Sequence, residues 1–359
     1  MKLYRTLSLL VVGLGAIGLT AAQGCSSSDS GSSGTAPASA GRVPPAPPVG
    51  AAPSDTPART FALNQLFLGE TGRNGAALKD AWKDYGYNID GLTTTKDSKD
   101  VCQRVAGADS AKQEDGKEGI DNAFGRTVLG FILGLVPTPS KTINDSVQGG
   151  SFTILLDIKG LTDDPKQTNT GLSGRLLVGG SFGEGKKPTF SPADDWPYRA
   201  SPNVDINGAY INNGTFVNGT GGATVELSLL IQGVSLALSI NRASITFDHT
   251  APGEITNGTI SGVISTEALV TGIEKVAGRI STQLCGGSTL DTIKQTIRQA
   301  SDIRSDGTNA AGVPCDSISI GLGFTGKQIG APKTIAGDTA PPPDPCTAGD
   351  AGTDGGDAG

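Results

Sequence analysis

The clearest pattern along the chain is the alternation of apolar and polar residues between positions 225 and 264. Every second side chain is apolar through 225–231, 236–240, 243–247 and 260–264. Segments of this kind, separated by Gln-Gly, Asn-Arg and Asn-Gly pairs, are typical of antiparallel strands that bury one face and are joined by tight turns. Further strands are predicted over 61–68, 152–158, 172–178 and 317–324.

The periodicity changes after Thr266. Apolar residues recur at helical spacing over 269–280 and again over 290–297, which predicts two short helices before the last strand. The sequence Ser288-Thr-Leu-Asp has the form of a capping box, so the second helix is expected to begin at Ser288. The apolar run 128–136 fits either a buried strand or a short helix, and residues 77–85 are predicted to include another short helix.

These elements predict a mainly β protein. We expect an antiparallel β-sandwich or jelly-roll-like domain with two short helices inserted before its last strand. The composition is uniform from residue 61 to residue 335, so this block is interpreted as a single domain. With 53 Gly, 21 Pro and only 18% charged residues, the chain is typical of an exported β-protein with flexible ends.

The start of the chain has the pattern of a targeting segment. Residues 1–24 combine a short basic stretch, an apolar run and small residues before Cys25, which predicts a signal peptide. The sequence Leu-Thr-Ala-Ala-Gln-Gly-Cys that ends at Cys25 resembles the lipobox of bacterial lipoproteins. The resemblance implies a lipid on Cys25 and, with Ser26 after it, an outer-membrane location. A plain signal peptide cleaved nearby is the alternative.

Both ends of the predicted domain continue into sequence that cannot form a core. Residues 25–60 are rich in Ser, Gly and Pro and are predicted to be a disordered tether. Residues 336–359 form an acidic, repetitive segment that is predicted to be a disordered tail.

Charge and histidine content exclude several functions. The formal net charge is -7 and no Lys/Arg cluster is present, so nucleic acid is excluded as a partner. The chain has one histidine, His249, which excludes a zinc site built from several histidines. Because His249 lies at the end of a predicted strand, just before a Pro-Gly turn, we expect its side chain to face solvent.

Four cysteines remain after Cys25, an even number that predicts disulfides in an exported protein. Cys285 precedes the second helix and Cys315 precedes the last strand, so we expect a Cys285–Cys315 bond that clamps the helical insertion. By elimination Cys102 would pair with Cys346. A free thiol at Cys346 is the alternative, because that residue lies in the predicted tail.

Acidic residues gather between positions 85 and 125 and again in the loop 302–309. The first stretch offers hard oxygen ligands and glycines, which suit Ca²⁺. The candidate calcium ligands are Asp90, Asp115, Glu118, Asp121 and Asn122. The spacing is not that of an EF-hand, and the competing interpretation is a pair of turns in which the carboxylates accept hydrogen bonds from backbone amides.

A second candidate site combines carboxylates with aromatic rings. Asp194 and Asp195 precede Trp196 and Tyr198 in a predicted loop, and Asp163-Asp164 lies in another. In a sugar cleft the rings would stack on the substrate while the acids bind hydroxyls or act as acid and base. The competing interpretation is that Trp196 packs over the edge of the sheet.

Three further motifs carry a resemblance. Tyr87-Asn-Ile-Asp-Gly, Gly119-Ile-Asp-Asn and Cys315-Asp-Ser-Ile-Ser-Ile-Gly-Leu-Gly-Phe, together with the lipobox, resemble a group of uncharacterised exported lipoproteins of Gram-negative bacteria. The resemblance implies no activity. We therefore expect a lipid-anchored protein of the cell envelope with a non-catalytic binding or structural domain, whose partner is a carbohydrate or an envelope protein. The alternative is a carboxylate-dependent enzyme that acts on polysaccharide.

Overall fold

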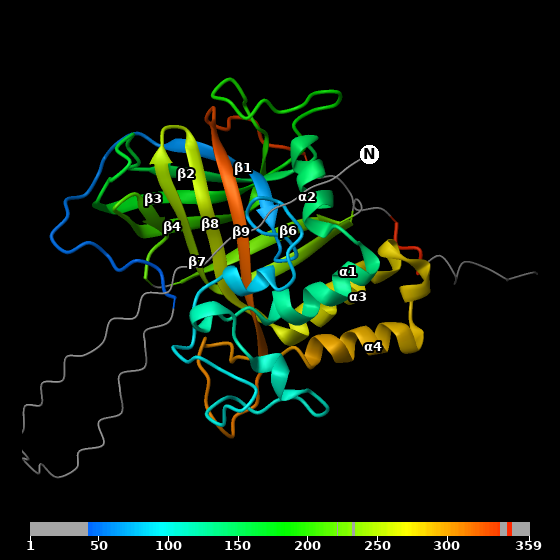
Figure 1. Cartoon of the computed structure of the whole chain (residues 1–359). Coiled ribbons are helices and arrows are strands. Elements are labelled where there is room, and N and C mark those ends of the chain that lie inside the picture. The colour runs from blue at the N-terminus through cyan, green and yellow to red at the C-terminus, as the bar shows by residue number, and fades with distance from the viewer. Residues whose placement is uncertain (1–41, 221, 232–233, 338–342, 347–359) are drawn as a thin grey trace, which may run out of the picture. The chain divides into compact units, whose positions relative to one another are not determined.

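The computed structural model describes residues 42–220, 222–231, 234–337 and 343–346 (Figure 1). The strands are β1 (Arg59–Phe67), β2 (Thr153–Lys159), β3 (Asn169–Gly179), β4 (Tyr198–Asn212), β5 (Thr215–Val217), β6 (Ala223–Ile231), β7 (Val234–Ala251), β8 (Glu254–Ser265) and β9 (Ser317–Ile329). The helices are α1 (Leu129–Leu135), α2 (Pro139–Gln148), α3 (Thr266–Ile280) and α4 (Gly287–Arg298). Short helical turns are η1 (Ala81–Asp84), η2 (Ser110–Gln113), η3 (Lys117–Gly119), η4 (Phe124–Val128) and η5 (Thr282–Leu284).

The strands form an antiparallel sheet that closes on itself. Their order is β5-β4-β3-β2-β1-β9-β8-β7-β6, and β5 also pairs with β7. This additional pairing joins Phe216 to Phe247 and closes eight strands into a barrel, which leaves β6 as an extra strand on β7. The predicted antiparallel β class is therefore confirmed, but the sandwich or jelly-roll is wrong. Alternation of apolar and polar residues shows that one face of each strand is buried. It does not distinguish a sandwich from a closed barrel, because the strands of both bury one face.

One contiguous hydrophobic core fills the space between the strands and the helices. Inward side chains of the barrel and the buried faces of α1 to α4 belong to the same cluster. Within it, the rings of Phe216 and Phe247 stack with centroids 4.5 Å apart at the point where the barrel closes. The barrel is therefore sealed by aromatic packing as well as by backbone hydrogen bonds.

The two predicted helices before the last strand are confirmed as α3 and α4. Ser265 caps α3 by accepting a hydrogen bond from Ala268 N, whereas α4 begins at Gly287 and has no side-chain cap. The capping box expected at Ser288 is therefore wrong. The ambiguous run 128–136 contains α1, and the helix predicted within 77–85 is the single turn η1.

The outer face of β9 is shaped to receive the segment around Tyr85. Gly321 and Gly323 face outward on β9, whereas Ile320 and Leu322 are completely buried. A Cβ at Gly321 would overlap the carbonyl of Tyr85, and one at Gly323 would overlap its ring. The alternation of large residues and glycine in this strand therefore lets a second layer of chain lie directly on the sheet.

Two disulfides are present among the described residues, and their pairing differs from the expectation. Cys102 bonds to Cys315, and Cys285 bonds to Cys346. The predicted pairs Cys285–Cys315 and Cys102–Cys346 are therefore wrong. The reason is local: Gln103 forms a parallel bridge with the residue before Cys315, and this bridge brings Cys102 beside it.

The end of the predicted tether lies on the barrel. Residues 42–58, which we name the strap, run along the outside of the sheet before β1 begins (blue in Figure 1). Pro53 forms a parallel bridge with Thr170 of β3, and Thr56 O accepts a hydrogen bond from Gly160 N at 2.9 Å. The predicted signal peptide and Cys25 lie outside the described residues, as do residues 347–359 of the predicted tail.

Candidate functional site

Three of the expected calcium ligands accept hydrogen bonds from the backbone, and of these Asp121 is buried whereas Asp90 and Asp115 are half-buried. Asp121 Oδ2 accepts from Ile89 N at 2.6 Å, and Asp90 Oδ1 accepts from Leu92 N at 2.7 Å. Asp115 Oδ2 accepts from Thr94 N at 2.5 Å. This is the arrangement of carboxylate-stabilised turns.

The loop 302–309 joins the same region. Asn309 Nδ2 donates to Asp90 Oδ2 at 2.6 Å, across 219 residues of sequence. Asp302 is buried and accepts hydrogen bonds from Ser319 N at 2.8 Å and from the Ser319 hydroxyl. The two acidic loops that the sequence singled out are thus one structural unit, which fixes the start of β9.

The other two expected ligands are elsewhere. The Glu118 side chain is exposed, and its residue is held by a backbone hydrogen bond from Arg42 N to Glu118 O at 2.9 Å. Asn122 is buried and directs its amide at the backbone of Gly321. Within the described part of the chain no three His, Cys, Asp or Glu side chains are placed to hold a metal ion together.

Burial and mutual repulsion govern the ionisation of this acidic region. Burial, together with the charges of Asp90 and Asp302, raises the pKa of Asp115 to about 8. Burial raises the pKa of Asp302 to about 7, although its hydrogen bonds with Ser319 oppose the shift. The pKa of Asp121 lies well above its usual range for the same reason. The region is therefore sensitive to pH between the usual carboxyl range and neutrality.

The candidate sugar site is a packed corner of the protein. Trp196 is fully buried against Phe182 and Phe190, with ring centroids 5.1 and 5.8 Å away, and its Nε1 donates to Gly180 O at 2.8 Å. A ring in this position has no free face for a sugar. These contacts agree with the competing interpretation, in which Trp196 packs over the sheet.

The neighbouring carboxylates also act within the fold. Asp194 is buried, and its carboxylate accepts hydrogen bonds from Thr189 N and Phe190 N at 2.8 and 2.7 Å. Asp195 Oδ1 accepts from Lys333 N at 3.0 Å. Tyr198 N donates to Thr334 O at 2.9 Å. Together these bonds tie the loop before β4 to the segment that follows β9.

His249 is buried, so the expectation that it faces solvent is wrong. Its side chain is 1% exposed and meets the ring of Phe61 edge-on at 5.5 Å. Nδ1 lies 2.9 Å from Glu254 O and Nε2 lies 3.1 Å from Thr162 O. The ring thus connects a loop, a hairpin and β1 at one end of the barrel.

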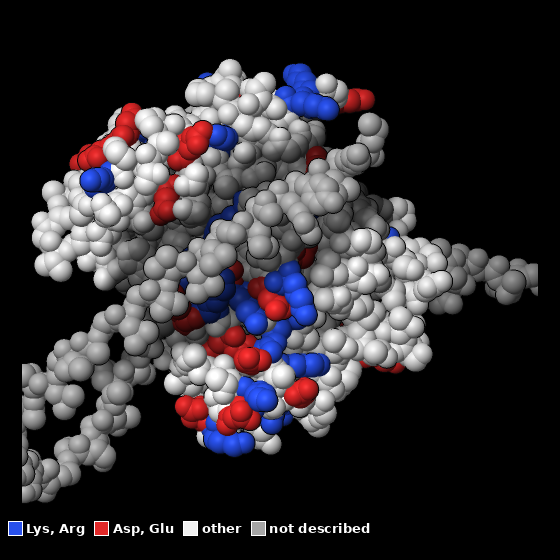
Figure 2. Space-filling model, in the orientation of Figure 1, with Lys and Arg blue, Asp and Glu red and all other residues white. Residues whose placement is uncertain are grey.

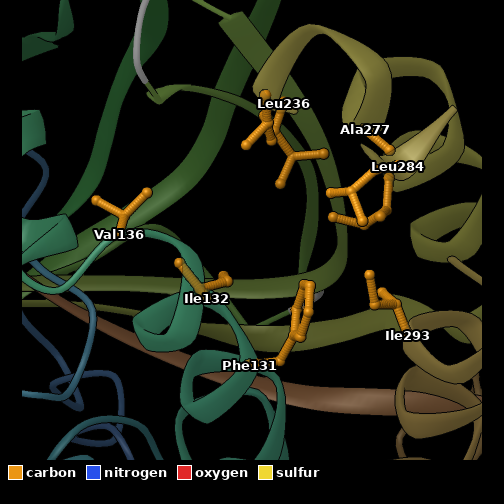
Figure 3. Close-up of a pocket in the computed structure, with 9 residues that line it drawn as sticks. Phe131, Ile132, Val136, Leu236, Ala277, Leu284 and Ile293 are labelled. Carbon is orange, nitrogen blue, oxygen red and sulfur yellow. The ribbon is translucent and has the colours of Figure 1, made fainter. Parts of the chain in front are cut away.

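An apolar pocket lies between α1, α3, α4 and β7 (Figure 3). Its walls are Phe131, Ile132, Val136, Leu236, Ile273, Ala277, Ile280, Leu284 and Ile293. Side chains from α1 face those from the other elements across a common space. The cavity has a volume of about 20 Å³, enough for a single water-sized sphere, yet its walls offer no polar partner to a water molecule.

The wall that α1 contributes lacks the kind of ion pair that joins α3 to α4. Across α3 and α4, Glu267 pairs with Arg298 at 2.7 Å and Glu274 pairs with Lys294 at 2.8 Å. By contrast, α1 has seven residues, of which two are glycine, and residues 127–140 carry no charged side chain. A helix this short gains little stability from its own backbone, so packing alone holds it.

The surface on the side of the pocket formed by α3 and α4 is also poor in charge. In Figure 2 the surface over the right-hand ends of α3 and α4 is mostly white, whereas charged side chains gather toward the centre and the lower edge. The uncharged apolar run 128–136 was only an indirect sign of this pocket in the sequence. Nothing in that run identified the partners from β7, α3 and α4.

Comparison with known proteins gave no matching family model, no matching curated relative and no matching solved structure. None of the helices in the described ranges has the length and hydropathy needed to cross a bilayer.

Proposed function

We propose that this chain is a lipid-anchored protein of the cell envelope that binds a single hydrocarbon chain and catalyses no reaction. The observation that carries the proposal is the pocket beneath α1, whose nine lining residues are all apolar. Hydrocarbon gains about 0.8 kcal/mol for each CH₂ group that leaves water, and such walls offer a charged or hydroxylated ligand nothing in return.

Entry of a ligand requires α1 to move outward, because the closed cavity has a volume of only about 20 Å³. The composition of α1 suits such a movement. Gly130 and Gly134 lower its helix propensity, and a Cβ at either position would meet no other atom within 4 Å. An acyl chain that separates α1 from α3 would replace the contacts that α1 loses.

The carboxylates considered for polysaccharide chemistry do not favour an enzyme. Asp194 and Asp195 accept backbone hydrogen bonds, and the ring of Trp196 is buried. An acid and base pair needs two carboxyl groups that face a substrate across an open cleft. The alternative of a polysaccharide-acting enzyme therefore has no observation in its favour.

The proposed function does not require calcium. Glu118 is exposed and the amide of Asn122 bonds to Gly321, whereas the oxygens of Asp90, Asp115 and Asp121 accept backbone hydrogen bonds.

Ligand binding is tested by displacing a fluorescent fatty acid from the full-length protein with saturated fatty acids of increasing chain length. Ala277→Leu narrows the pocket, whereas Ala268→Leu places the same side chain on an exposed position of the same helix. We expect Ala277→Leu to weaken binding about tenfold or more and Ala268→Leu to leave it unchanged. Equal binding by the two variants, or none by the unaltered protein, would refute the proposal.

The anchor is tested separately, in a Gram-negative host. We expect the unaltered chain to incorporate labelled palmitate and to sediment with membranes, and Cys25→Ser to do neither. Membrane association that survives Cys25→Ser would mean that the lipid is not the anchor, and it would leave the result for the pocket unaffected.

A further inference from the structure

Most of the hydrogen bonds between the strap and the barrel are accepted by carbonyl groups of the strap. Tyr210 Oη donates to Pro45 O at 2.6 Å, and Asn212 Nδ2 donates to Ala46 O at 3.0 Å. Further along, Thr170 N donates to Ala52 O at 3.2 Å. Two side chains and one backbone N–H of the barrel therefore donate hydrogen bonds to carbonyl oxygens of the strap.

The strap is rich in proline where it crosses this surface. Pro44, Pro45, Pro47 and Pro48 have no N–H group, so within residues 44–48 only Ala46 can donate a backbone hydrogen bond, whereas every carbonyl can accept one. Proline also holds a chain extended before it binds, and this lowers the entropy lost on docking. Tyrosine rings with a donor at the tip are the side chains with which proline-recognition grooves bind such segments.

A groove remains open beneath the strap. Pro44, Pro45, Ala46 and Pro47 form one wall, and the opposite wall includes Tyr87, Tyr210 and Arg242. Its volume is about 320 Å³. Both tyrosines are buried and fixed: Tyr87 Oη lies 2.7 Å from Thr246 Oγ1, and Tyr210 Oη is bonded to the strap.

The ends of the strap are held more firmly than its middle. At the first end, Arg42 O accepts from Asn88 N at 2.7 Å, and the Arg42 guanidinium lies 5.9 Å from the centre of the Tyr87 ring. Between these contacts and the bridge at Pro53, Val43 and Val49 are exposed. The hydrogen bonds that residues 43–50 accept from the barrel come from Tyr210 and Asn212, so the middle of the strap can leave the groove once these two are broken, while the ends stay bound.

We propose that the groove between Tyr87 and Tyr210 is a docking site for an extended, proline-rich segment of a partner protein. In this structure the strap forms one wall of the site and accepts the hydrogen bonds of Tyr210 and Asn212, so it acts as a built-in competitor. A segment of the same chemistry would accept the same hydrogen bonds from Tyr210 and Asn212 once the strap moves aside. Because the strap is tethered beside the groove, it competes at an effective concentration on the order of 1 mM, so a partner binds weakly until the strap is released.

The experiment uses a fluorescein-labelled peptide with the sequence of residues 42–50 and measures its fluorescence polarisation with the full-length protein. Replacing Pro44, Pro45, Pro47 and Pro48 by serine weakens the strap in place. We expect this strap variant to bind the peptide at least tenfold more tightly than the unaltered protein. A milder variant, Arg42→Ala, removes one end contact and is expected to increase affinity about threefold, so the test does not depend on a single altered chain.

Groove residues are tested in the strap-variant background. Tyr210→Phe removes the donor to Pro45 O, and we expect it to reverse most of the tenfold gain. Tyr198→Phe is the matched control, because its backbone and not its hydroxyl forms the bonds described above. A peptide with serine in place of proline should not bind. No binding by either strap variant, or equal binding with Tyr210→Phe and Tyr198→Phe, would overturn the proposal.

Sedimentation of the unaltered protein identifies the occupant. A monomer at all concentrations supports a partner segment as the natural occupant. A dimer that Tyr210→Phe dissociates would show that straps are exchanged between two copies, and it would overturn the assignment to a partner protein.

Discussion

Asn122 bonds to the backbone of Gly321 through both atoms of its side-chain amide. Nδ2 donates to Gly321 O at 3.1 Å and Oδ1 accepts from Gly321 N at 3.0 Å. The paired part of β1 ends at Phe67, which lies opposite Gly323. If β1 continued past Phe67, its backbone would bond to the N–H and C=O of Gly321. The side-chain amide of Asn122 makes these two hydrogen bonds instead.

The first prediction is that Asn122 is a stability residue. Asn122→Ala leaves the N–H and C=O of Gly321 without their partner in a buried place, so we expect a loss of about 3 kcal/mol in the free energy of unfolding. Asn122→Asp should also destabilise, because a carboxylate cannot donate. Asn203→Ala, at an exposed position, should change stability by less than about 0.5 kcal/mol. Urea unfolding measures all three, and a neutral Asn122→Ala would contradict the role given to Asn122.

The second prediction contrasts two glycines. A Cβ at Gly321 would overlap the Tyr85 carbonyl, whereas a Cβ at Gly130 in α1 would meet nothing within 4 Å. We expect Gly321→Ala to cost more than about 2 kcal/mol through backbone displacement. Gly130→Ala should add up to about 1 kcal/mol, because alanine favours the helix. If α1 moves to admit a ligand, Gly130→Ala should also slow fatty-acid association in stopped-flow fluorescence.

The third prediction concerns the disulfides. The Cys102–Cys315 bond closes a span of 213 residues and the Cys285–Cys346 bond one of 61, which gives about 5 and 4 kcal/mol on the chain-entropy account. The first bond is also the more deeply placed, with Cys102 and Cys315 2% and 6% exposed. Replacing the first pair by serine should therefore cost more stability than replacing the second. Peptide mapping without reductant should give a Cys102–Cys315 fragment, and a Cys285–Cys315 fragment would refute this connectivity.

Local patterns in the sequence predicted most strands and both helices before β9. They did not predict the closure of the barrel, because β5 has only three residues and its partners on β7 lie 31 positions further along the chain, as in Phe216 and Phe247. They also missed α2, in which Ile143 and Val147 are the only aliphatic side chains among polar residues. Burial of these two side chains, together with Pro139 and Ser140, stabilises the helix more than its own helix propensity does.

The acidic region shows the same limit at the level of a site. The sequence identified Asp90 and the loop 302–309 as separate turns, but no spacing reveals that Asn309 donates to Asp90 across 219 residues. Nor did it reveal that the apolar run 128–136 would face Leu236 and Ile273 across a pocket. Such relationships depend on tertiary packing, and one sequence carries no periodicity for them.

The fourth prediction is that stability falls as pH rises from about 4 to about 8. The folded-state pKa of Asp115 is raised to about 8 and that of Asp302 to about 7, whereas an unfolded Asp titrates near 3.9. Over this interval the folded protein therefore binds more protons than the unfolded chain, and protonation stabilises it. The benefit is complete below the unfolded pKa and is lost as pH passes through the folded values. Thermal unfolding at a series of pH values measures the slope.

Asp302→Asn provides the control for that slope. The amide keeps an acceptor for Ser319 N and cannot ionise, so this variant should lose part of the pH dependence while it stays folded. The exposed pair Asp163→Asn and Asp306→Asn should not flatten the slope, because the pKa of each of these carboxyls is lowered rather than raised. Melting temperatures that do not change between pH 5 and 8 would contradict the burial of charge described here. Melting temperatures at pH 8 with calcium or with a chelator test for a bound ion. If calcium removed the loss of stability at high pH, the carboxylates would be its ligands. If calcium has no such effect, protonation of the carboxylates alone sets the slope.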